Sequence, residues 1–128
     1  SQVSQVESVF RAVGSVFRVE ERQMHAVTGL AGSGPAYVSL IVEGLAAGAV
    51  RKGIAPGPAR EIACQLLLGS AKLLLEKKLH PALLREQVTT PAGTTIAGLR
   101  ELEAHAVRGA LLAAVEAAAE RSEELAQG

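Results

Sequence analysis

The spacing of hydrophobic residues along this chain predicts a protein built mainly of helices. Residues 2 to 13 place valines and a phenylalanine three and four positions apart, as on one face of a helix, and Gly14 follows as a stop. The same spacing recurs further along the chain at about residues 21 to 30, 35 to 52, 58 to 78, 81 to 88 and 95 to 125. In the last of these stretches, the sequence EAHAVRG predicts a bend.

Glycine and proline residues mark the expected helix boundaries. The glycines of GLAGSGPAY are expected to end the second helix, Ser33 or Gly34 to cap the third, and Pro35 to lie in its first turn. Gly53 and Pro56 separate the third helix from the fourth. Because the third helix is apolar on nearly all sides, we expect it to lie at the centre of the fold.

One short stretch does not fit a helix. In residues 15 to 19, SVFRV, the large apolar residues Phe17 and Val19 lie two positions apart, which is typical of a strand. A single strand is not stable alone. We expect it to pair with another chain, or with a sheet whose other strands lie outside this sequence.

Composition supports one all-α domain over residues 1 to 128. Hydrophobic residues make up 48% of the chain but aromatic residues only 2%, so Leu, Val, Ile and Ala must build closely packed helices. The length is that of a single domain. Asn and Asp do not occur, which indicates either a thermophilic source or a biased genome composition.

Charge and reactive side chains argue against several classes of partner. The 13 basic and 13 acidic residues give a net charge of +0, without the positive surface that nucleic acid requires. Cys64 has no second cysteine, and His25, His80 and His105 lack metal-ligand spacing, so we expect no metal. No signal peptide opens the chain, and the nearly uncharged AYVSLIVEGLAAGAV is short for a bilayer and contains Glu43. We expect a cytoplasmic protein without a membrane partner.

The sequence TTPAGTTIAGL is the best candidate for binding chemistry. Thr89, Thr90, Thr94 and Thr95 offer hydroxyls, Gly93 allows a ligand close to the backbone, and a new helix begins with free N–H groups. These are the elements of a small-anion site. The alternative is a plain helix cap at Thr94 or Thr95, which the residues alone favour. The glycines of GLAGSGPAY make no dinucleotide motif, because no strand leads into them.

Two motifs together resemble a known family. AVTGLAGSGPAYVSLIVEGL and QVTTPAGTTIAGLRELE, in a helical chain ending AAVEAAAERSEEL, resemble the C-terminal domain of pyrroline-5-carboxylate reductase over essentially the whole sequence. The resemblance implies an interlocked helical dimer, compatible with a higher oligomer of dimers. It implies reduction of 1-pyrroline-5-carboxylate to L-proline with NADPH or NADH, bound mainly by an N-terminal domain absent from this chain. The isolated chain is then not expected to turn over, and the strand at residues 15 to 19 would join the absent sheet.

The same resemblance assigns roles to residues. It places the substrate carboxylate on the backbone N–H groups of one loop: Thr90, Pro91, Ala92, Gly93, Thr94 and Thr95. It gives Thr95 the catalytic position, with its hydroxyl facing the ring nitrogen, and Gln87 a position near the cofactor of the neighbouring protomer. Ala92 stands where the family commonly has glycine. Two other classes stay open: a free-standing helical module that binds small carboxylates, and a purely structural dimerisation module.

Overall fold

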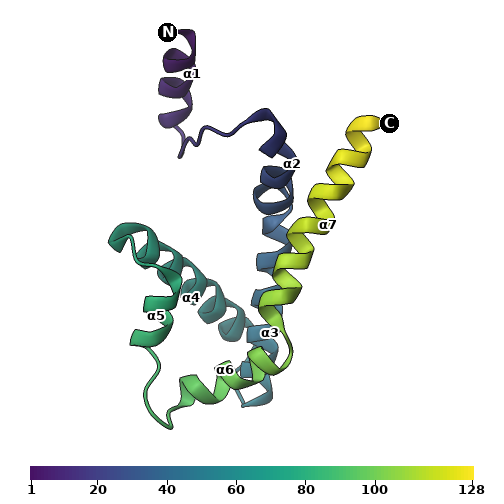
Figure 1. Ribbon diagram of the computed structural model, residues 1–128. Helices are drawn as coiled ribbons and strands as arrows, with labels where there is room; N and C mark the ends of the chain where they lie inside the picture. The colour runs from purple at the N-terminus through teal and green to yellow at the C-terminus, as the bar shows by residue number, and fades with distance from the viewer.

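The computed structural model describes all 128 residues and contains helices but no β-strand. The helices, shown in Figure 1, are α1 (Gln2–Arg11), α2 (Met24–Val27), α3 (Gly34–Arg51), α4 (Pro56–Lys77), α5 (Pro81–Gln87), α6 (Thr94–Ala104) and α7 (Val107–Gln127). A 3₁₀ turn, Glu21–Gln23, precedes α2, and a π-helical turn, Thr28–Gly32, follows it. The prediction of an all-α fold is confirmed.

The segment at residues 15 to 19, predicted as a strand that pairs outside this sequence, forms no strand in the single chain. Residues 15 to 20 have no regular structure. The physical reason is that a strand is defined by hydrogen bonds to a neighbour, and this chain has no second strand to supply them. The segment instead connects α1 to the rest of the molecule, from which α1 stands apart in Figure 1.

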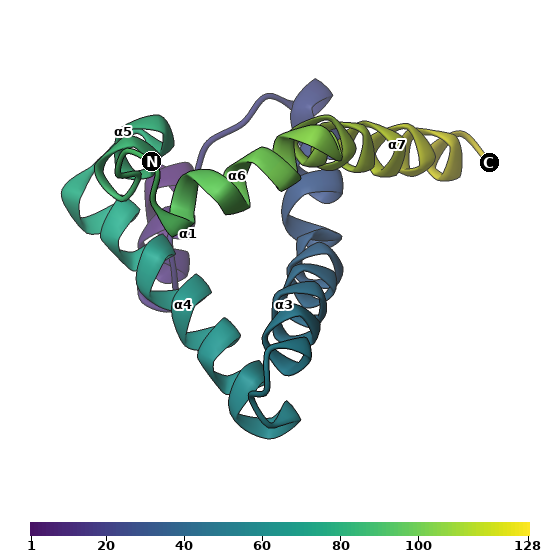
Figure 2. The ribbon, with the colours of Figure 1, turned by 90° about the horizontal axis from the view of Figure 1, so that it is seen from below.

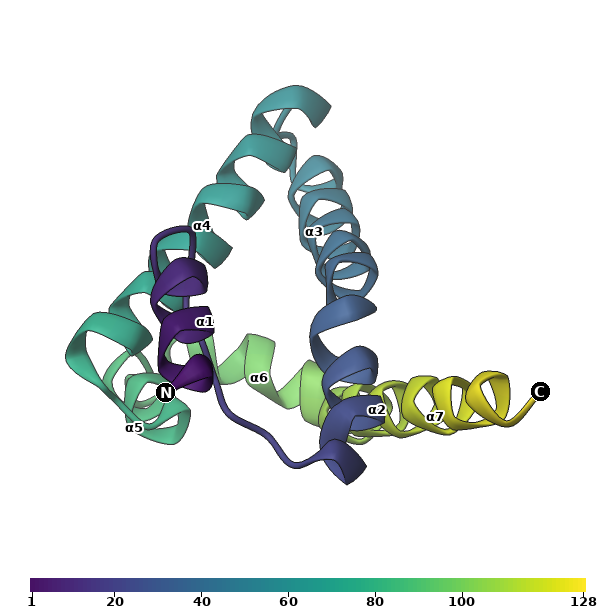
Figure 3. The same cartoon turned by 90° about the horizontal axis from the view of Figure 1, so that it is seen from above.

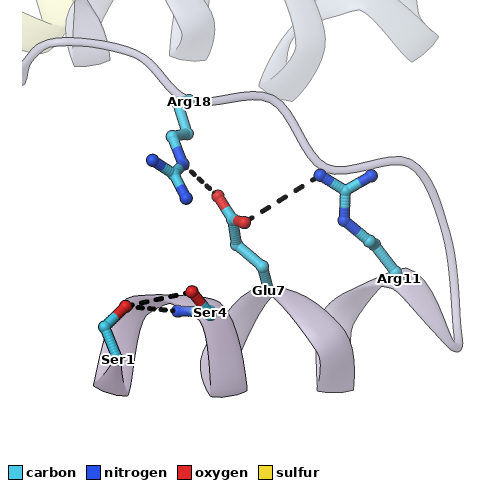
Figure 4. A network of polar contacts seen from close by, with 5 residues as sticks. All are labelled: Ser1, Ser4, Glu7, Arg11 and Arg18. Carbon is cyan, nitrogen blue, oxygen red and sulfur yellow. Dashed lines mark hydrogen bonds and ion pairs between the residues drawn. The ribbon is translucent and has the colours of Figure 1, made fainter.

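A polar network ties this connecting segment back to α1 (Figure 4). The Glu7 carboxylate accepts a hydrogen bond from the Arg18 side chain, and the Arg11 guanidinium lies 3.9 Å from its other oxygen. The hydrogen bond from Arg18 holds the pKa of Glu7 below its ordinary value; desolvation opposes this effect, and the charges of Arg18 and Arg11 add to it. At the start of α1, the Ser1 hydroxyl accepts from the Ser4 backbone N–H at 3.3 Å. Because the side chains of Arg11 and Arg18 are largely exposed, the network orients the segment more than it stabilises it.

The glycines of GLAGSGPAY do not end a helix, contrary to expectation. The Ser33 N–H donates to the Thr28 carbonyl at 3.0 Å, five residues back, so the chain passes through a π-helical turn directly into α3. None of these glycines has positive φ. Gly29 serves packing instead: it is buried, and a Cβ on it would lie 2.6 Å from the Val115 carbonyl oxygen of α7. The sequence pattern was misjudged because this contact comes from a distant helix.

Two side chains of this region, Tyr37 and His25, hydrogen-bond to α7. The Tyr37 hydroxyl lies 3.1 Å from the Gly29 carbonyl oxygen and 3.2 Å from that of Ala114. His25 Nδ1 lies 2.8 Å from Ser122 Oγ. The structural role expected for His25 therefore has a specific partner.

The helical path Glu21–Arg51 is also longer than the sequence indicated. Its 31 residues are long and apolar enough to cross a bilayer, as judged by length and composition alone. The expectation of a segment too short for a bilayer concerned only AYVSLIVEGLAAGAV, and the helical turns before it add most of the remaining length. A core helix covered by protein has the same length and composition.

The later helix boundaries agree with the sequence. Gly53, with φ of 100°, ends α3, and Pro56 begins α4. The bend predicted in EAHAVRG lies between α6 and α7, where Ala106 has a left-handed backbone with φ of 53°. His80 caps the start of α5, with Nδ1 accepting from the Ala82 N–H at 3.1 Å.

The helices form an open frame. Figures 2 and 3 show α3, α4 and α6 as the sides of a triangle, with α7 extending from one corner. The most extensive helix contacts are those of α3 with α4 and of α7 with α2 and the π-helical turn. Neither α1 nor α5 packs extensively on another helix.

Only four residues of the chain are buried: Gly29, Ala46, Ala59 and Ala63. A compact monomer of 13.2 kDa would expose about 6,400 Å². This chain exposes 10304 Å², and leucines such as Leu40, Leu68 and Leu75 are more than 60% exposed. The helix α3, expected at the centre, has only Ala46 buried. The single chain therefore leaves most of its apolar side chains without cover.

The Gly29 contact predicts a specific loss of stability. Gly29→Ala places a methyl group against the Val115 carbonyl and within 3.0 Å of the Ala119 backbone nitrogen. Because backbone atoms cannot rotate away, we expect a loss of about 1–3 kcal/mol in the free energy of unfolding. Urea unfolding at fixed protein concentration, followed by circular dichroism, measures it.

Gly32→Ala is the matched control in the same turn. Its Cβ would meet only the Thr28 methyl, at an ordinary 3.7 Å. We expect its midpoint to stay at or above that of the parent chain. Equal losses for both variants would contradict the packing role of Gly29.

Candidate functional site

The candidate site is the connection between α5 and α6, and its first residues close the end of α5. The Val88 N–H donates to the Leu84 carbonyl at 3.2 Å, and the Thr89 N–H donates to the Glu86 backbone carbonyl at 3.1 Å. The Thr89 hydroxyl donates to the Arg85 carbonyl at 2.6 Å. Thr89 thus ends the helix, and its hydroxyl proton is already engaged, so it cannot donate to a ligand.

The next four residues form a tight turn. The Gly93 N–H donates to the Thr90 carbonyl at 3.2 Å, with Pro91 and Ala92 between them. Ala92 adopts a left-handed backbone with φ of 54°, a conformation that favours glycine. Gly93 is extended, with φ of −84° and ψ of −179°, and directs the chain into α6.

No threonine caps α6, so the alternative of a plain cap at Thr94 or Thr95 was wrong. Gly93 is the N-cap, and no side chain makes a capping hydrogen bond. Thr94 and Thr95 fail as caps because they already lie inside the first helical turn. The N–H groups of Thr94, Thr95 and Ile96 donate to no other group of the chain.

The loop therefore presents several unsatisfied donors in a short space. In addition to the helix N–H groups, the Ala92 N–H and the hydroxyls of Thr90, Thr94 and Thr95 make no hydrogen bond within the chain. Thr95 and Gly93 are half-buried, and Thr90 and Thr94 are exposed. Neutral donors at a helix N-terminus suit a small anion such as a carboxylate. The structure brings the predicted residues from Thr90 to Thr95 together in one turn.

Gln87 and the glycine-rich segment take no part in a nucleotide site within this chain. Gln87 is the last residue of α5, with an exposed side chain. The segment GLAGSGPAY runs through helical turns, with no strand before it. A dinucleotide fold needs a strand leading into a glycine turn, so the residues present do not fit this cofactor.

Histidines and acids do not gather into a further site. No three His, Cys, Asp or Glu side chains lie together as metal ligands would. His105 Nδ1 lies 2.8 Å from the Glu101 carbonyl oxygen, so His105, like His25 and His80, has a hydrogen-bond partner within the protein.

A hollow that the sequence did not reveal lies beside the loop. It measures about 670 Å³ and lies between α4 and α5, with Arg85 and Val88 on the side nearest the loop. The residues from Thr90 to Thr95 do not line this hollow. The single chain supplies the donors of the site but does not enclose them.

The sequence matches a family model described as pyrroline-5-carboxylate reductase dimerisation over residues 21 to 125. Among curated proteins, the chain is 48% identical over 124 residues to a pyrroline-5-carboxylate reductase of Synechocystis sp., covering 97% of this chain and 46% of the relative. It is also 48% identical over 122 residues to pyrroline-5-carboxylate reductase 3 of Bos taurus, covering 95% and 40%. The chain thus spans less than half the length of these relatives.

Solved structures agree with the sequence matches. A pyrroline-5-carboxylate reductase of Coxiella burnetii superposes with a TM-score of 0.91 at 37% identity, over 97% of this chain and 46% of that one. The pyrroline carboxylate reductase of Plasmodium falciparum, solved with NADP bound, gives a TM-score of 0.86 at 29% identity, over 95% and 47%. The family match, the identities and the shared fold agree that this chain belongs to the pyrroline-5-carboxylate reductase dimerisation family.

Proposed function

We propose that this chain is the dimerisation and substrate-binding part of an NAD(P)H-dependent reductase that converts 1-pyrroline-5-carboxylate to L-proline, the last step of proline biosynthesis. One observation supports it most directly. The turn from Thr90 to Thr95 presents unsatisfied N–H and hydroxyl donors at the start of α6, inside the segment that matches the reductase family. The substrate has one carboxylate, which is the group that these donors fit.

The loop residues of this chain orient the substrate. The free N–H groups of Thr94 and Thr95 hold the carboxylate, and the positive end of the α6 dipole favours its charge. The half-buried Thr95 hydroxyl has no partner within the chain, so it is free to hydrogen-bond the ring nitrogen. When the substrate is reduced, its imine carbon gains a hydride and this nitrogen gains a proton. Fixing the nitrogen beside the hydroxyl is an orientation effect.

The hydride must come from a nicotinamide that this chain does not hold. Gln87, at the end of α5, is the residue we assign to contact the cofactor of a neighbouring protomer. In the relative from Plasmodium falciparum the cofactor present is NADP. We therefore expect the 128-residue chain alone to show no NAD(P)H binding by calorimetry and no turnover.

A second copy of the chain is the partner that we assign to the uncovered helices. The exposed area of each chain exceeds that of a compact monomer by about 3,900 Å², or about 7,800 Å² for two chains, whereas an obligate interface commonly buries 2,000–5,000 Å² or more over both partners. The balanced charge favours a protein partner over nucleic acid. We assign the apolar path Glu21–Arg51 to this interface rather than to a bilayer, and the protein to the cytoplasm.

Two other functions predict different results. A free-standing module for small carboxylates would bind L-proline in a titration without NAD(P)H and gain no activity when joined to a cofactor-binding partner. A structural dimer would show no ligand effect. Replacing the matched segment of the Synechocystis relative with this chain tests all three, because only the proposed function gives a chimera that reduces 1-pyrroline-5-carboxylate.

Thr95→Ala should lower kcat/KM of this chimera by about ten- to a hundredfold, because one polar contact to the reacting ring is lost. Thr95→Ser keeps the hydroxyl and should recover most of the rate. Since Thr95 caps no helix, the melting temperature should change little. Steady-state kinetics and thermal unfolding of both variants measure these effects.

The control for Thr95 is Thr28→Ala. The Thr28 hydroxyl donates to the Met24 carbonyl at 3.0 Å, remote in sequence from the loop. The kcat/KM of the Thr28→Ala chimera should equal that of the parent chimera. A Thr95→Ala variant with unchanged kcat/KM would refute the assigned role of the hydroxyl.

Ala92→Gly should stabilise the chain by about 0.5–1 kcal/mol. The left-handed backbone at Ala92 costs an L-residue about 1–2 kcal/mol, and glycine avoids that cost while gaining some entropy in the unfolded state. Ala97→Gly, in α6, is the matched control and should destabilise by about 1 kcal/mol. The two substitutions should therefore shift the urea midpoint in opposite directions; shifts of the same sign would contradict the strain at Ala92.

A further inference from the structure

One carbonyl group in the π-helical turn before α3 has an unusual donor. In an α-helix, the Ser33 N–H would donate to the carbonyl of Gly29, four residues back. Here it donates to the Thr28 carbonyl, five residues back, at 3.0 Å. The Gly29 carbonyl oxygen lies 3.1 Å from the Tyr37 hydroxyl instead. The tyrosine hydroxyl thus takes the place that a backbone N–H has in an ordinary helix.

The Tyr37 hydroxyl and the Ser33 N–H are alternative donors to one acceptor. Gly29 is buried against α7, and Tyr37 and Ser33 are both half-buried. A buried carbonyl without a donor is costly, so one of the two must supply the hydrogen bond. While the tyrosine hydroxyl supplies it, the Ser33 N–H can bond one residue further back, and the turn keeps its extra residue.

Pro35 contributes to this geometry in a different way. It has no N–H, and inside a continuous α-helix its ring would press on the Ala31 carbonyl. Pro35 therefore favours a break in the α-helical pattern at this place. Because it cannot donate to the Gly29 carbonyl, it leaves that group to Tyr37.

The extra residue sets which faces of the two helical segments point the same way. Tyr37 follows Gly29 by eight residues, which in a regular α-helix would place the two about 80° apart around the axis. The π-helical turn absorbs one residue, so the spacing is equivalent to about seven residues and the two lie within about 20° of one line. His25, four residues before Gly29, lies on the same face.

This shared face contacts α7, which lies beside it in Figure 1. His25 hydrogen-bonds to Ser122, toward the C-terminal end of α7. The Tyr37 hydroxyl lies 3.2 Å from the Ala114 carbonyl oxygen. A phenol has one proton, so the hydroxyl donates to one of its two carbonyl neighbours at a time or shares the proton between them. A change of register in the turn would rotate His25 away from Ser122.

We propose that Tyr37 is a positioning residue: its hydroxyl holds the turn Thr28–Gly32 in the π-helical register and so fixes the rotation of α2, and of the chain before it, relative to α3 and α7. In the proposed reductase, the chain before α2 connects to the cofactor-binding part. The turn then sets how that part is oriented toward the loop Thr90 to Thr95. This consequence rests on the proposed function, whereas the control of the register does not.

The first test is structural and uses crystals of the 128-residue chain. Tyr37→Phe keeps the ring and removes only the hydroxyl. We expect the acceptor of the Ser33 N–H to change from the Thr28 carbonyl to the Gly29 carbonyl. A Tyr37→Phe structure that keeps the Thr28 acceptor would overturn the proposal.

Ser39→Ala is the matched control on α3. It removes a hydroxyl two positions after Tyr37, one that donates to the Pro35 carbonyl at 2.8 Å. This variant should keep the Thr28 acceptor. A change of register in both variants would mean that the turn responds to any loss of a hydroxyl on α3, which contradicts the specific role of Tyr37.

The second test measures kinetics in the chimera with the Synechocystis relative. Tyr37→Phe should lower kcat by about tenfold, because the cofactor part is turned relative to the substrate loop. The KM for 1-pyrroline-5-carboxylate should change little, since the loop itself is unaltered. Ser39→Ala should match the parent chimera in both constants.

The outcomes separate this proposal from the proposed function. A raised KM with unchanged kcat in Tyr37→Phe would show an effect on substrate binding and refute the positioning role. An unchanged kcat in a variant whose register has changed would refute the link to the cofactor part. If the register changes as expected but the folded parent chimera reduces no substrate, the proposed function fails while the role of Tyr37 in the turn stands.

Discussion

The helices of this chain cannot cover one another, and the rest of the structure depends on that constraint. Four buried residues, all glycine or alanine, mark the places where helices approach closely, while leucines and valines along α3 and α4 face outward. Burial of such side chains is the main favourable term in folding, at about 25 cal/mol for each Å² of apolar surface. A fold with this much apolar surface exposed needs a second surface against it, which agrees with membership of a dimerisation family.

The same constraint shapes the candidate site. The loop from Thr90 to Thr95 connects α5 to α6, and α5 makes no extensive contact with the other helices. A binding site needs donors held rigidly, so helices that are loose in one chain must be fixed by what packs against them. In our account, the second copy that covers the helices also steadies the loop. Local hydrogen bonds, such as those from Thr89 and Gly93, set only the shape of the turn.

Features with local causes could be predicted from the sequence. Gly53 and Pro56 separate two helices by backbone conformation alone, and the bend in EAHAVRG and the helical class follow from spacing and composition. The loop residues were found because threonine and glycine at a helix start are unusual in an Ala-rich and Leu-rich chain.

Features set by distant residues could not be predicted in this way. Gly29 looked like a helix stop, but its role is the contact with Val115 on α7, far away in sequence. The segment at residues 15 to 19 has the pattern of a strand, yet pairing requires a second strand that the chain does not contain. Thr94 and Thr95 looked like caps, and only the coordinates place Gly93 in that position.

The central claim is that a second copy of the chain completes the fold. Sedimentation equilibrium of the 128-residue chain at micromolar concentration, on a sample shown to be helical by circular dichroism, tests it most directly. The account predicts a species of twice the 13.2 kDa of one chain, or a multiple of that dimer. A helical, cooperatively unfolding species of 13.2 kDa would contradict it.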